Sequence, residues 1–186
     1  MKRSISILLS IVLILMTFTP ALADSQDDYY KQAGEILGSV KVLQGNASGD
    51  LMLNNYLNRQ DMVVLVSRLF KEESTARNSS PKVPFKDVTD NFYKPYISWS
   101  VNKGLIVGKT ETKFGFNETV TVQQLQTVLL RALGYNEEAK NWEDVPTFAT
   151  SLGLMDNINT QPNNTVIRGS MAGKTVNALR LNKKGT

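Results

Sequence analysis

The stretch Val83–Tyr135 reads VPFKDVTDNFYKPYISWSVNKGLIVGKTETKFGFNETVTVQQLQTVLLRALGY, and it decides the fold. It holds two amphipathic segments that a glycine-containing loop separates. In the first segment, apolar residues recur at helical spacing, at Tyr93, Ile97 and Val101. This pattern predicts a helix near residues 91–103, with Asp87 and Asp90 where it begins. The helix is expected to end at Gly104, because glycine adopts the left-handed conformation freely.

The second segment predicts another helix, near residues 122–133. Thr121 and Gln124 have the spacing of a capping box, in which a hydroxyl and an amide side chain satisfy free backbone N–H groups. Apolar residues then fall on one helical face, at Leu125, Val128, Leu129, Ala132 and Leu133. A helix, a glycine loop and a capped helix therefore form one unit.

The same unit occurs three times. Residues 42–45 (VLQG) match residues 105–108 (LIVG), and this offset of 63 positions holds without a gap through the second predicted helix. A third, shorter copy is marked by Asp144-Val145, which matches Asp87-Val88. The repeats predict a mainly-α chain of three tandem helix-loop-helix modules.

The N-terminus carries an export signal. Lys2 and Arg3 precede an apolar run from Ile5 to Phe18, and Ala21-Leu22-Ala23 has the small residues of a cleavage site. The apolar run is shorter than the roughly 20 residues that a membrane-spanning helix needs. We therefore expect a cleaved signal peptide rather than an uncleaved anchor, a secreted mature chain, and no membrane association after cleavage.

The repeats and the signal divide the chain into five parts. These are the signal peptide (1–23), module 1 with a divergent first helix (24–73), a polar linker (74–82), module 2 (83–136) and a degenerate module 3 (137–186). Module 3 lacks a capping side chain at Ile167, where the other modules have Asn58 and Thr121. Module 3 is therefore expected to be the least stable.

The composition excludes several kinds of site. The chain has no cysteine and no histidine, which removes thiol chemistry, thiolate metal ligands and the commonest general base. Without Lys2 and Arg3, the 21 basic residues fall to 19 against 17 acidic ones, a net charge of +2. Nucleic acid binding normally needs a stronger basic surface. Adjacent acids at Glu72-Glu73 and Glu137-Glu138 have no orienting partner in the sequence, so we expect no enzyme, no metal and no cofactor.

These residues resemble the S-layer homology (SLH) module. The resemblance rests on an F-x-D-V start, a glycine after the first helix and an aromatic loop, which module 2 supplies as Phe85, Asp87, Val88, Ile97, Ser100, Gly104, Leu105, Phe114 and Phe116. A T-R-A-E-like motif starts each second helix, as Asn58-Arg59-Gln60-Asp61, Thr121-Val122-Gln123-Gln124 and Ile167-Arg168-Gly169-Ser170. The resemblance covers nearly all of the mature chain and is strongest in module 2.

The resemblance implies three modules packed as a pseudo-threefold helical spindle, with grooves between neighbouring modules. It also implies non-covalent anchoring to the cell wall of a Gram-positive bacterium, through secondary cell-wall polysaccharides that typically carry an acidic pyruvate ketal. In that family the arginine of the motif meets the acidic sugar. S-layer proteins or other surface proteins are further partners that the resemblance implies.

Arg59 and Arg168 fit this role on physical grounds. An arginine in the first turn of a helix holds a planar group of five donors near free backbone N–H groups, and both favour an anion such as a carboxylate. Arg59 is expected to lie outside the apolar stripe, so that its removal weakens binding without unfolding the protein. Module 2 has Val122 at this position and lacks the cation.

Four further residues are candidates for ligand contact: Trp99, Gly108, Thr121 and Gln123. Trp99 either offers a stacking face for a sugar or packs between helices. Gly108 either lets a ligand approach the backbone or forms a turn. An alternative function stays open, namely an exported protein that binds other surface proteins or assembles with an S-layer after losing glycan binding. The missing arginine in module 2 and the weak module 3 favour that alternative.

Overall fold

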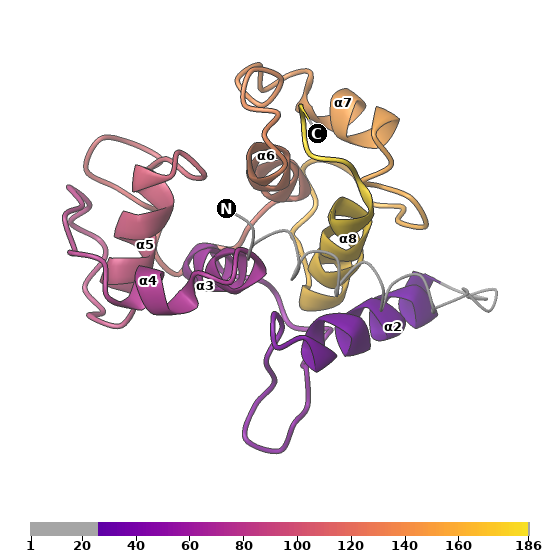
Figure 1. Cartoon of the computed structure of the whole chain (residues 1–186), viewed down its shortest axis with the longest axis horizontal. Helices are drawn as coiled ribbons and strands as arrows, with labels where there is room; N and C mark the ends of the chain where they lie inside the picture. Colours follow the sequence, from indigo (N-terminus) through magenta and orange to yellow (C-terminus); the bar gives the residue numbers. More distant parts are fainter. Residues whose placement is uncertain (1–25, 186) are drawn as a thin grey trace.

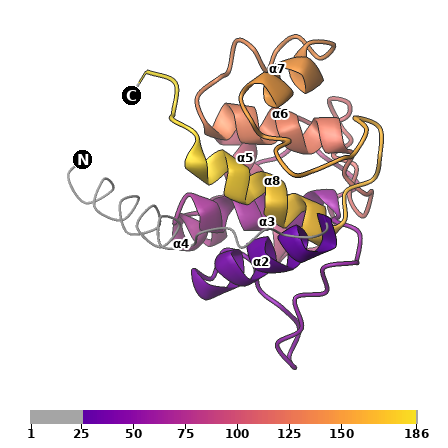
Figure 2. The same cartoon turned by 90° about the vertical axis from the view of Figure 1, so that its right-hand side faces the viewer.

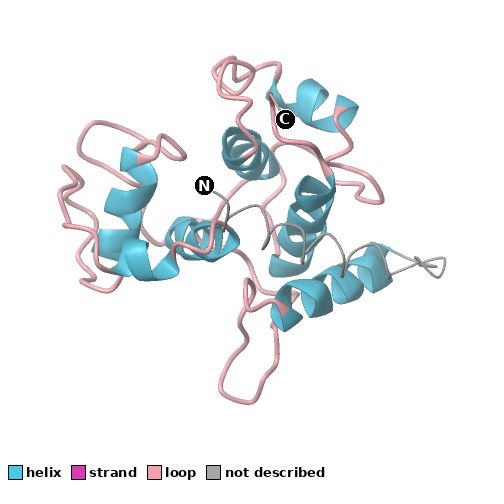
Figure 3. Ribbon diagram, viewed as in Figure 1, coloured by secondary structure: helices cyan, strands magenta, loops and turns pink. Residues whose placement is uncertain are grey.

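The fold is built from helices (Figure 1, Figure 3). The computed structural model of the chain describes residues 26–185, so the signal peptide predicted for residues 1–23 lies outside the described residues. Within the described range the regular structure is helical, apart from isolated β-bridges, and the prediction of a mainly-α fold is confirmed. None of the described helices is long and apolar enough to cross a membrane. They are α2 (Gln26–Ser39), α3 (Arg59–Leu69), α4 (Glu73–Arg77), α5 (Tyr93–Asn102), α6 (Val122–Ala132), α7 (Val145–Ser151) and α8 (Arg168–Arg180).

The predicted helices of module 2 differ from the observed ones only at their ends. α5 begins at Tyr93 rather than near residue 91, and Asp90 instead accepts the N–H of Phe92 in the turn before the helix. The predicted linker, residues 74–82, is not entirely a loop, because its first residues belong to α4. The side chain of Ala76 is fully buried and packs α4 into the core. The module boundaries themselves remain a prediction from the sequence.

The first helix of each module packs against the second helix of another module. α5 packs against α3, α7 packs against α6, and α2 packs against α8. Figure 1 shows these three pairs around the middle of the molecule, and Figure 2 shows α8 between α2 and α6, both of which it contacts. The first and the last of the described helices therefore close a cycle of three pairs.

A ring of backbone hydrogen bonds lies at the centre of this cycle. Leu57, Val120 and Val166 occupy equivalent positions just before α3, α6 and α8, and each is at most 1% exposed. The N–H of Leu57 donates to the carbonyl of Val166 (2.9 Å), Val166 donates to Val120 (2.8 Å), and Val120 donates to Leu57 (2.9 Å). A buried backbone N–H needs an acceptor, and here each module takes its acceptor from another. The three modules are thus joined with pseudo-threefold symmetry.

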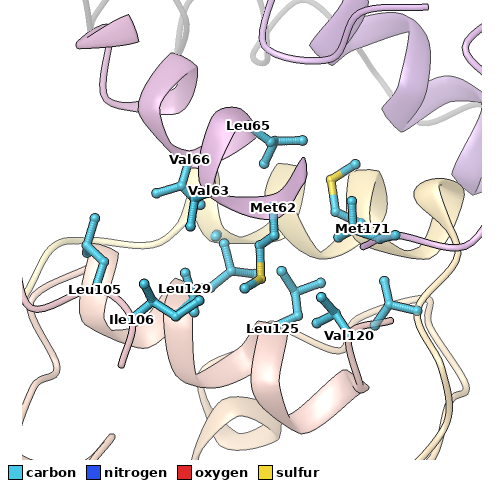
Figure 4. Close-up of a cluster of buried hydrophobic side chains, with 14 of the residues drawn as sticks. Met62, Val63, Leu65, Val66, Leu105, Ile106, Val120, Leu125, Leu129 and Met171 are labelled. Carbon is cyan, nitrogen blue, oxygen red and sulfur yellow. The ribbon is translucent and has the colours of Figure 1, made fainter. Parts of the chain in front are cut away.

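The apolar faces of the second helices meet in one core. Figure 4 shows Met62 and Val66 of α3, Leu125 and Leu129 of α6, and Met171 of α8 in a single cluster. All five side chains are 1% exposed or less. Because burial of apolar surface is the dominant favourable term in folding, the modules share their main source of stability rather than each having its own.

The caps of the second helices differ from the sequence prediction. Thr121 and Gln124 form the predicted capping box. Asn58 makes no side-chain cap hydrogen bond, and neither does Ile167. The prediction that a side-chain cap makes the second helix of module 1 more stable than that of module 3 is therefore wrong. In α3, α6 and α8 alike, a backbone carbonyl of another module accepts the first N–H group of the helix, so this group is satisfied whether or not a side chain caps the helix.

α8 is polar in sequence but enclosed in the structure. Ten of its residues are buried, including Lys174, which is 0% exposed. The equivalent positions in α3 and α6 hold Leu65 and Val128. The Lys174 ammonium donates only to two hydroxyls, Ser170 Oγ (2.5 Å) and Thr160 Oγ1 (3.1 Å). Burial lowers the pKa of Lys174 from 10.5 to about 7.

The burial of Lys174 predicts a stability that rises with pH. Between pH 7 and 10 the unfolded chain binds a proton at Lys174 that the folded chain does not, so raising the pH favours the folded state. The Lys174→Met variant lacks this effect. We expect it to be more stable than wild type at pH 7, by an amount that shrinks by about 1.4 kcal/mol for each pH unit between pH 7.5 and 9.5. Urea unfolding of both proteins at several pH values measures the difference. A constant difference across this range would show that Lys174 is charged in the folded protein.

Candidate functional site

The start of each second helix meets a loop of another module. The N–H groups of equivalent residues donate to loop carbonyls at 2.8–2.9 Å, namely Arg59 to Glu118, Val122 to Asn164 and Arg168 to Asn55. Three equivalent junctions result, between modules 1 and 2, modules 2 and 3, and modules 3 and 1. The side chain at the helix start differs between them, and so does what each junction can bind.

Arg59 is buried at the junction of modules 1 and 2. Its guanidinium donates from Nε to Phe114 O (3.0 Å) and from Nη2 to Val107 O (3.1 Å). The Cζ atom lies 5.0 Å from the centre of the Phe114 ring, and the residue is 6% exposed. Burial lowers the pKa of Arg59, partly opposed by Glu118 and Asp87. The expectation that Arg59 is dispensable for folding is therefore not supported, since its donors hold the neighbouring loop.

Asp87 shapes the loop that receives Arg59, and it does not cap α5. Its carboxylate accepts the N–H groups of Phe114, Gly115 and Phe116 at 2.7–2.9 Å. Burial opposes the ionisation of this carboxyl, but the three N–H groups outweigh it and lower the pKa of Asp87. Gly115 has a φ of +90°, and a Cβ there would lie 3.2 Å from Arg59 Cδ. The loop and the arginine therefore fit as one packed structure.

The junction of modules 2 and 3 holds no cation at its helix start. Val122 is fully buried. Gln123 is 6% exposed and donates from Nε2 to the carbonyl of Trp142. Thr121 is engaged in the capping box. Thr121 and Gln123, two of the candidate ligand residues, thus serve contacts within the protein.

Arg168, at the junction of modules 3 and 1, is only partly buried. Its guanidinium donates from Nε to Leu51 O (2.9 Å) and from Nη2 to Gln44 O (2.7 Å). Burial lowers its pKa, Asp61 opposes this, and the like charge of Arg68 lowers the pKa further. Among the described residues, the second terminal nitrogen, Nη1, has no hydrogen-bond partner.

A pocket of about 160 Å³ opens beside Arg168. Its polar lining comes from all three modules, as Gln44, Asp61, Arg68, Tyr93 and Arg168. Apolar residues of module 1 and Phe92 complete the wall, and Phe92 is 52% exposed. A concave site with an apolar wall and a few convergent polar groups is typical of ligand binding.

The charges in the pocket are unevenly neutralised. The hydroxyl of Tyr93 donates to Asp61 Oδ1 (2.8 Å), and burial together with this carboxylate raises the pKa of Tyr93. Arg68 is paired with Glu73, which does not line the pocket, from Nε to Oε1 at 3.0 Å. The pocket is therefore lined by two guanidinium groups and one carboxylate, and an anion complements it.

Trp99 and Gly108 lie outside this pocket. Trp99 is 4% exposed, donates from Nε1 to Glu72 (3.0 Å) and packs edge-on against Phe70. Trp99 therefore packs between helices, which is the alternative to its role as a stacking face for a sugar. At Gly108 a Cβ would lie 2.3 Å from Phe85 Cε1, so glycine is required by the close packing of a turn.

The adjacent acids have structural partners. Glu72 pairs with Lys103, Glu73 with Arg68 and Arg77, Glu137 with Lys140, and Glu138 with Lys184. Residues 26–185 contain no group of histidine, cysteine, aspartate and glutamate that could hold a metal ion.

Of the residues that line the pocket, only Arg168 could be recognised as a candidate from the sequence. Asp61 and Arg68 lie in the first and the third turn of α3, and Tyr93 begins α5 of the next module. A motif confined to one module cannot bring them together. The available signal was the repeat match of Arg68 with Arg131, which shows that an arginine recurs near the end of this helix.

Comparisons with known proteins point to the bacterial cell surface. No protein-family model matches the chain. The chain is 28% identical over 158 residues to a cell surface protein of Thermoanaerobacter kivui, covering 83% of this chain and 20% of that protein. It is 24% identical over 148 residues to the middle cell wall protein of Brevibacillus brevis, covering 78% and 14%. It is 26% identical over 172 residues to an endoglucanase of Bacillus sp. (strain KSM-635), covering 80% and 18%. The chain therefore spans a fifth or less of each relative.

The burial of Arg59 predicts a structural cost for its removal. Arg59→Ala should lower the free energy of unfolding by about 1–3 kcal/mol, because it leaves the carbonyl of the buried residue Phe114 without its donor. Arg180→Ala is the matched control, since this arginine is exposed at the C-terminal end of α8. The control should change stability by less than about 1 kcal/mol. Equal stabilities of the two variants in urea unfolding would contradict this assignment.

Proposed function

We propose that this chain is a non-catalytic segment that anchors an exported protein at the cell wall or cell surface of a Gram-positive bacterium. Two relatives are by name a cell surface protein and a cell wall protein, and each match covers more than three quarters of this chain. The endoglucanase shares only 18% of its length with the chain. A segment common to proteins of such different names fits a shared attachment role better than a shared reaction.

We further propose that its ligand is an acidic secondary cell-wall polysaccharide, bound in the Arg168 pocket. The observation that carries this proposal is the pocket lining, which contains Arg168, Arg68 and a single aspartate, Asp61. This aspartate already accepts a hydrogen bond from Tyr93. A planar guanidinium is suited to a carboxylate, and an ion pair in a partly desolvated site is stronger than one at the open surface. The pyruvate ketal of the SLH ligands carries such a carboxylate.

This proposal narrows the set of candidate ligand residues to one junction. Arg59 donates to two loop carbonyls and is 6% exposed, and Val122 has no charge. Arg168 has the same two kinds of bond to carbonyls, but it also lines a pocket. We therefore assign the principal ligand contact to Arg168 alone among the helix-start residues.

The alternative partner is another surface protein. Phe92 is a large apolar residue that is 52% exposed beside the pocket, and exposed aromatic residues are common in protein interfaces. A protein partner would not depend on the acidic groups of the polysaccharide. The two functions can therefore be separated with wall preparations that differ in those groups alone.

The test compares binding to native cell-wall sacculi with binding to sacculi whose pyruvyl groups have been removed. Wild-type protein should bind native sacculi and lose most of this binding on the treated ones. Arg168→Gln should weaken binding about 10- to 150-fold, since a charge-assisted contact contributes roughly 1.5–3 kcal/mol. Arg168→Lys should recover only part of it, because an ammonium lacks the planar fork. Salt should weaken wild-type binding as well.

Arg180→Gln is the matched control, because it removes the same charge from the exposed C-terminal end of the same helix. It should bind like wild type. Thermal unfolding of all variants shows whether each remains folded. If folded Arg168→Gln binds native sacculi as tightly as wild type, the pocket is not the glycan site. If wild type binds treated and native sacculi equally, the partner is not the acidic group and the protein-partner alternative is favoured.

A further inference from the structure

Arg68 departs from the behaviour of its equivalents in the other two modules. In module 2, Arg131 donates from Nη1 to the carbonyl of Leu105, at the start of the glycine loop. In module 3, Asn177 donates from Nδ2 to the carbonyl of Leu154, which is the matching loop position. Arg68 makes no such bond to a loop carbonyl of module 1. Its side chain is instead directed to Glu73 and to the pocket beside Arg168.

The hydrogen-bonding capacity of Arg68 is largely unused. Within residues 26–185 its side chain makes one hydrogen bond, from Nε to Glu73. The side chain is 18% exposed, and its two terminal nitrogens have no acceptor among the described residues. Arg168 has one terminal nitrogen in the same condition. These nitrogens are open to water, and an anion in the pocket would replace that water with charge-assisted hydrogen bonds.

The two guanidinium groups also repel each other. The charge of Arg68 lowers the pKa of Arg168, while Asp61 opposes this effect. Asp61 accepts a hydrogen bond from Tyr93, and Glu73 contacts Arg68 without lining the pocket. The protein therefore holds two like charges around one small space. Such an arrangement is common at sites where a ligand supplies the opposite charge.

We propose that Arg68 is a second ligand-contacting residue, which binds the carboxylate of the ligand together with Arg168. A carboxylate has two oxygens and can accept from both guanidinium groups at once. This inference rests on the function proposed above and goes beyond it, because it assigns a residue outside the helix-start motif. It also makes the site selective for a carboxylated sugar, since a neutral hydroxyl cannot offset the excess positive charge that two guanidinium groups and one carboxylate leave in the lining.

The test measures binding of the secondary cell-wall polysaccharide released from sacculi, at several salt concentrations. Arg68→Gln should weaken binding at least tenfold and should reduce the dependence of log Kd on log salt concentration by about one unit, because one cation has left the site. Arg131→Gln is the matched control, since it removes the equivalent arginine of module 2. This control should stay within twofold of wild type and keep its salt dependence.

Glu73→Gln separates ligand contact from a structural role. It weakens the pair that holds α4 to α3 but leaves the Arg68 guanidinium in the pocket. If Arg68 contacts the ligand, Glu73→Gln should bind at least as tightly as wild type. If Arg68 serves only to hold α4, Glu73→Gln and Arg68→Gln should weaken binding equally, and the inference fails.

The outcome also distinguishes this inference from the proposed function. If Arg168→Gln abolishes binding and folded Arg68→Gln binds like wild type, the proposed role of Arg68 is wrong, but the proposed function stands. Absence of polysaccharide binding by the wild type would overturn both. Should Arg68→Gln prove unfolded, Arg68→Lys replaces it. The lysine keeps the charge but lacks the fork, so it should weaken binding while retaining the salt dependence.

Discussion

The structure depends on one constraint, which is the closed ring of backbone hydrogen bonds among Leu57, Val120 and Val166. These residues are buried at the centre, where no water is available to satisfy an N–H or a carbonyl. Each bond joins a different pair of modules, so no module can satisfy its own central segment. The helix pairs obey the same rule, because α2, α5 and α7 each pack on the second helix of another module. The three modules therefore close the molecule together.

The same constraint explains why the three helix-start side chains are engaged to different degrees. The helix-start position always points at a loop of another module, so an arginine there first serves that loop through its carbonyls. At Arg59 the loop of module 2 is stabilised by hydrogen bonds to Asp87 and packs around the arginine side chain. At Val122 the loop of module 3 is shorter and the cation is absent. At Arg168 the contacts to Leu51 and Gln44 leave one side of the guanidinium beside a pocket.

Much of the fold follows from the sequence, because helical periodicity, glycine at helix ends and the repeat offset are local signals. The capping box at Thr121 and the left-handed Gly104, with a φ of +70°, are of this kind. The burial of Arg59 and of Lys174 was not predictable in this way. Arg59 contacts carbonyls and a ring of module 2, and α8, which carries Lys174, packs against helices of modules 1 and 2. No spacing within one module encodes these contacts. The pocket was missed for the same reason, since Arg168 stands 100 positions from Arg68 in the chain.

Native-state hydrogen exchange of the three ring amides tests the central claim most directly. If the ring and the shared core bind the modules into one cooperative unit, the amides of Leu57, Val120 and Val166 should exchange only through global unfolding. Their opening free energies should then agree within about 1 kcal/mol with each other and with the stability from urea unfolding. A Val166 amide that exchanges through an opening several kcal/mol lower than Leu57 and Val120 would contradict the account. It would show that module 3 detaches by itself and that the cycle does not hold the molecule together.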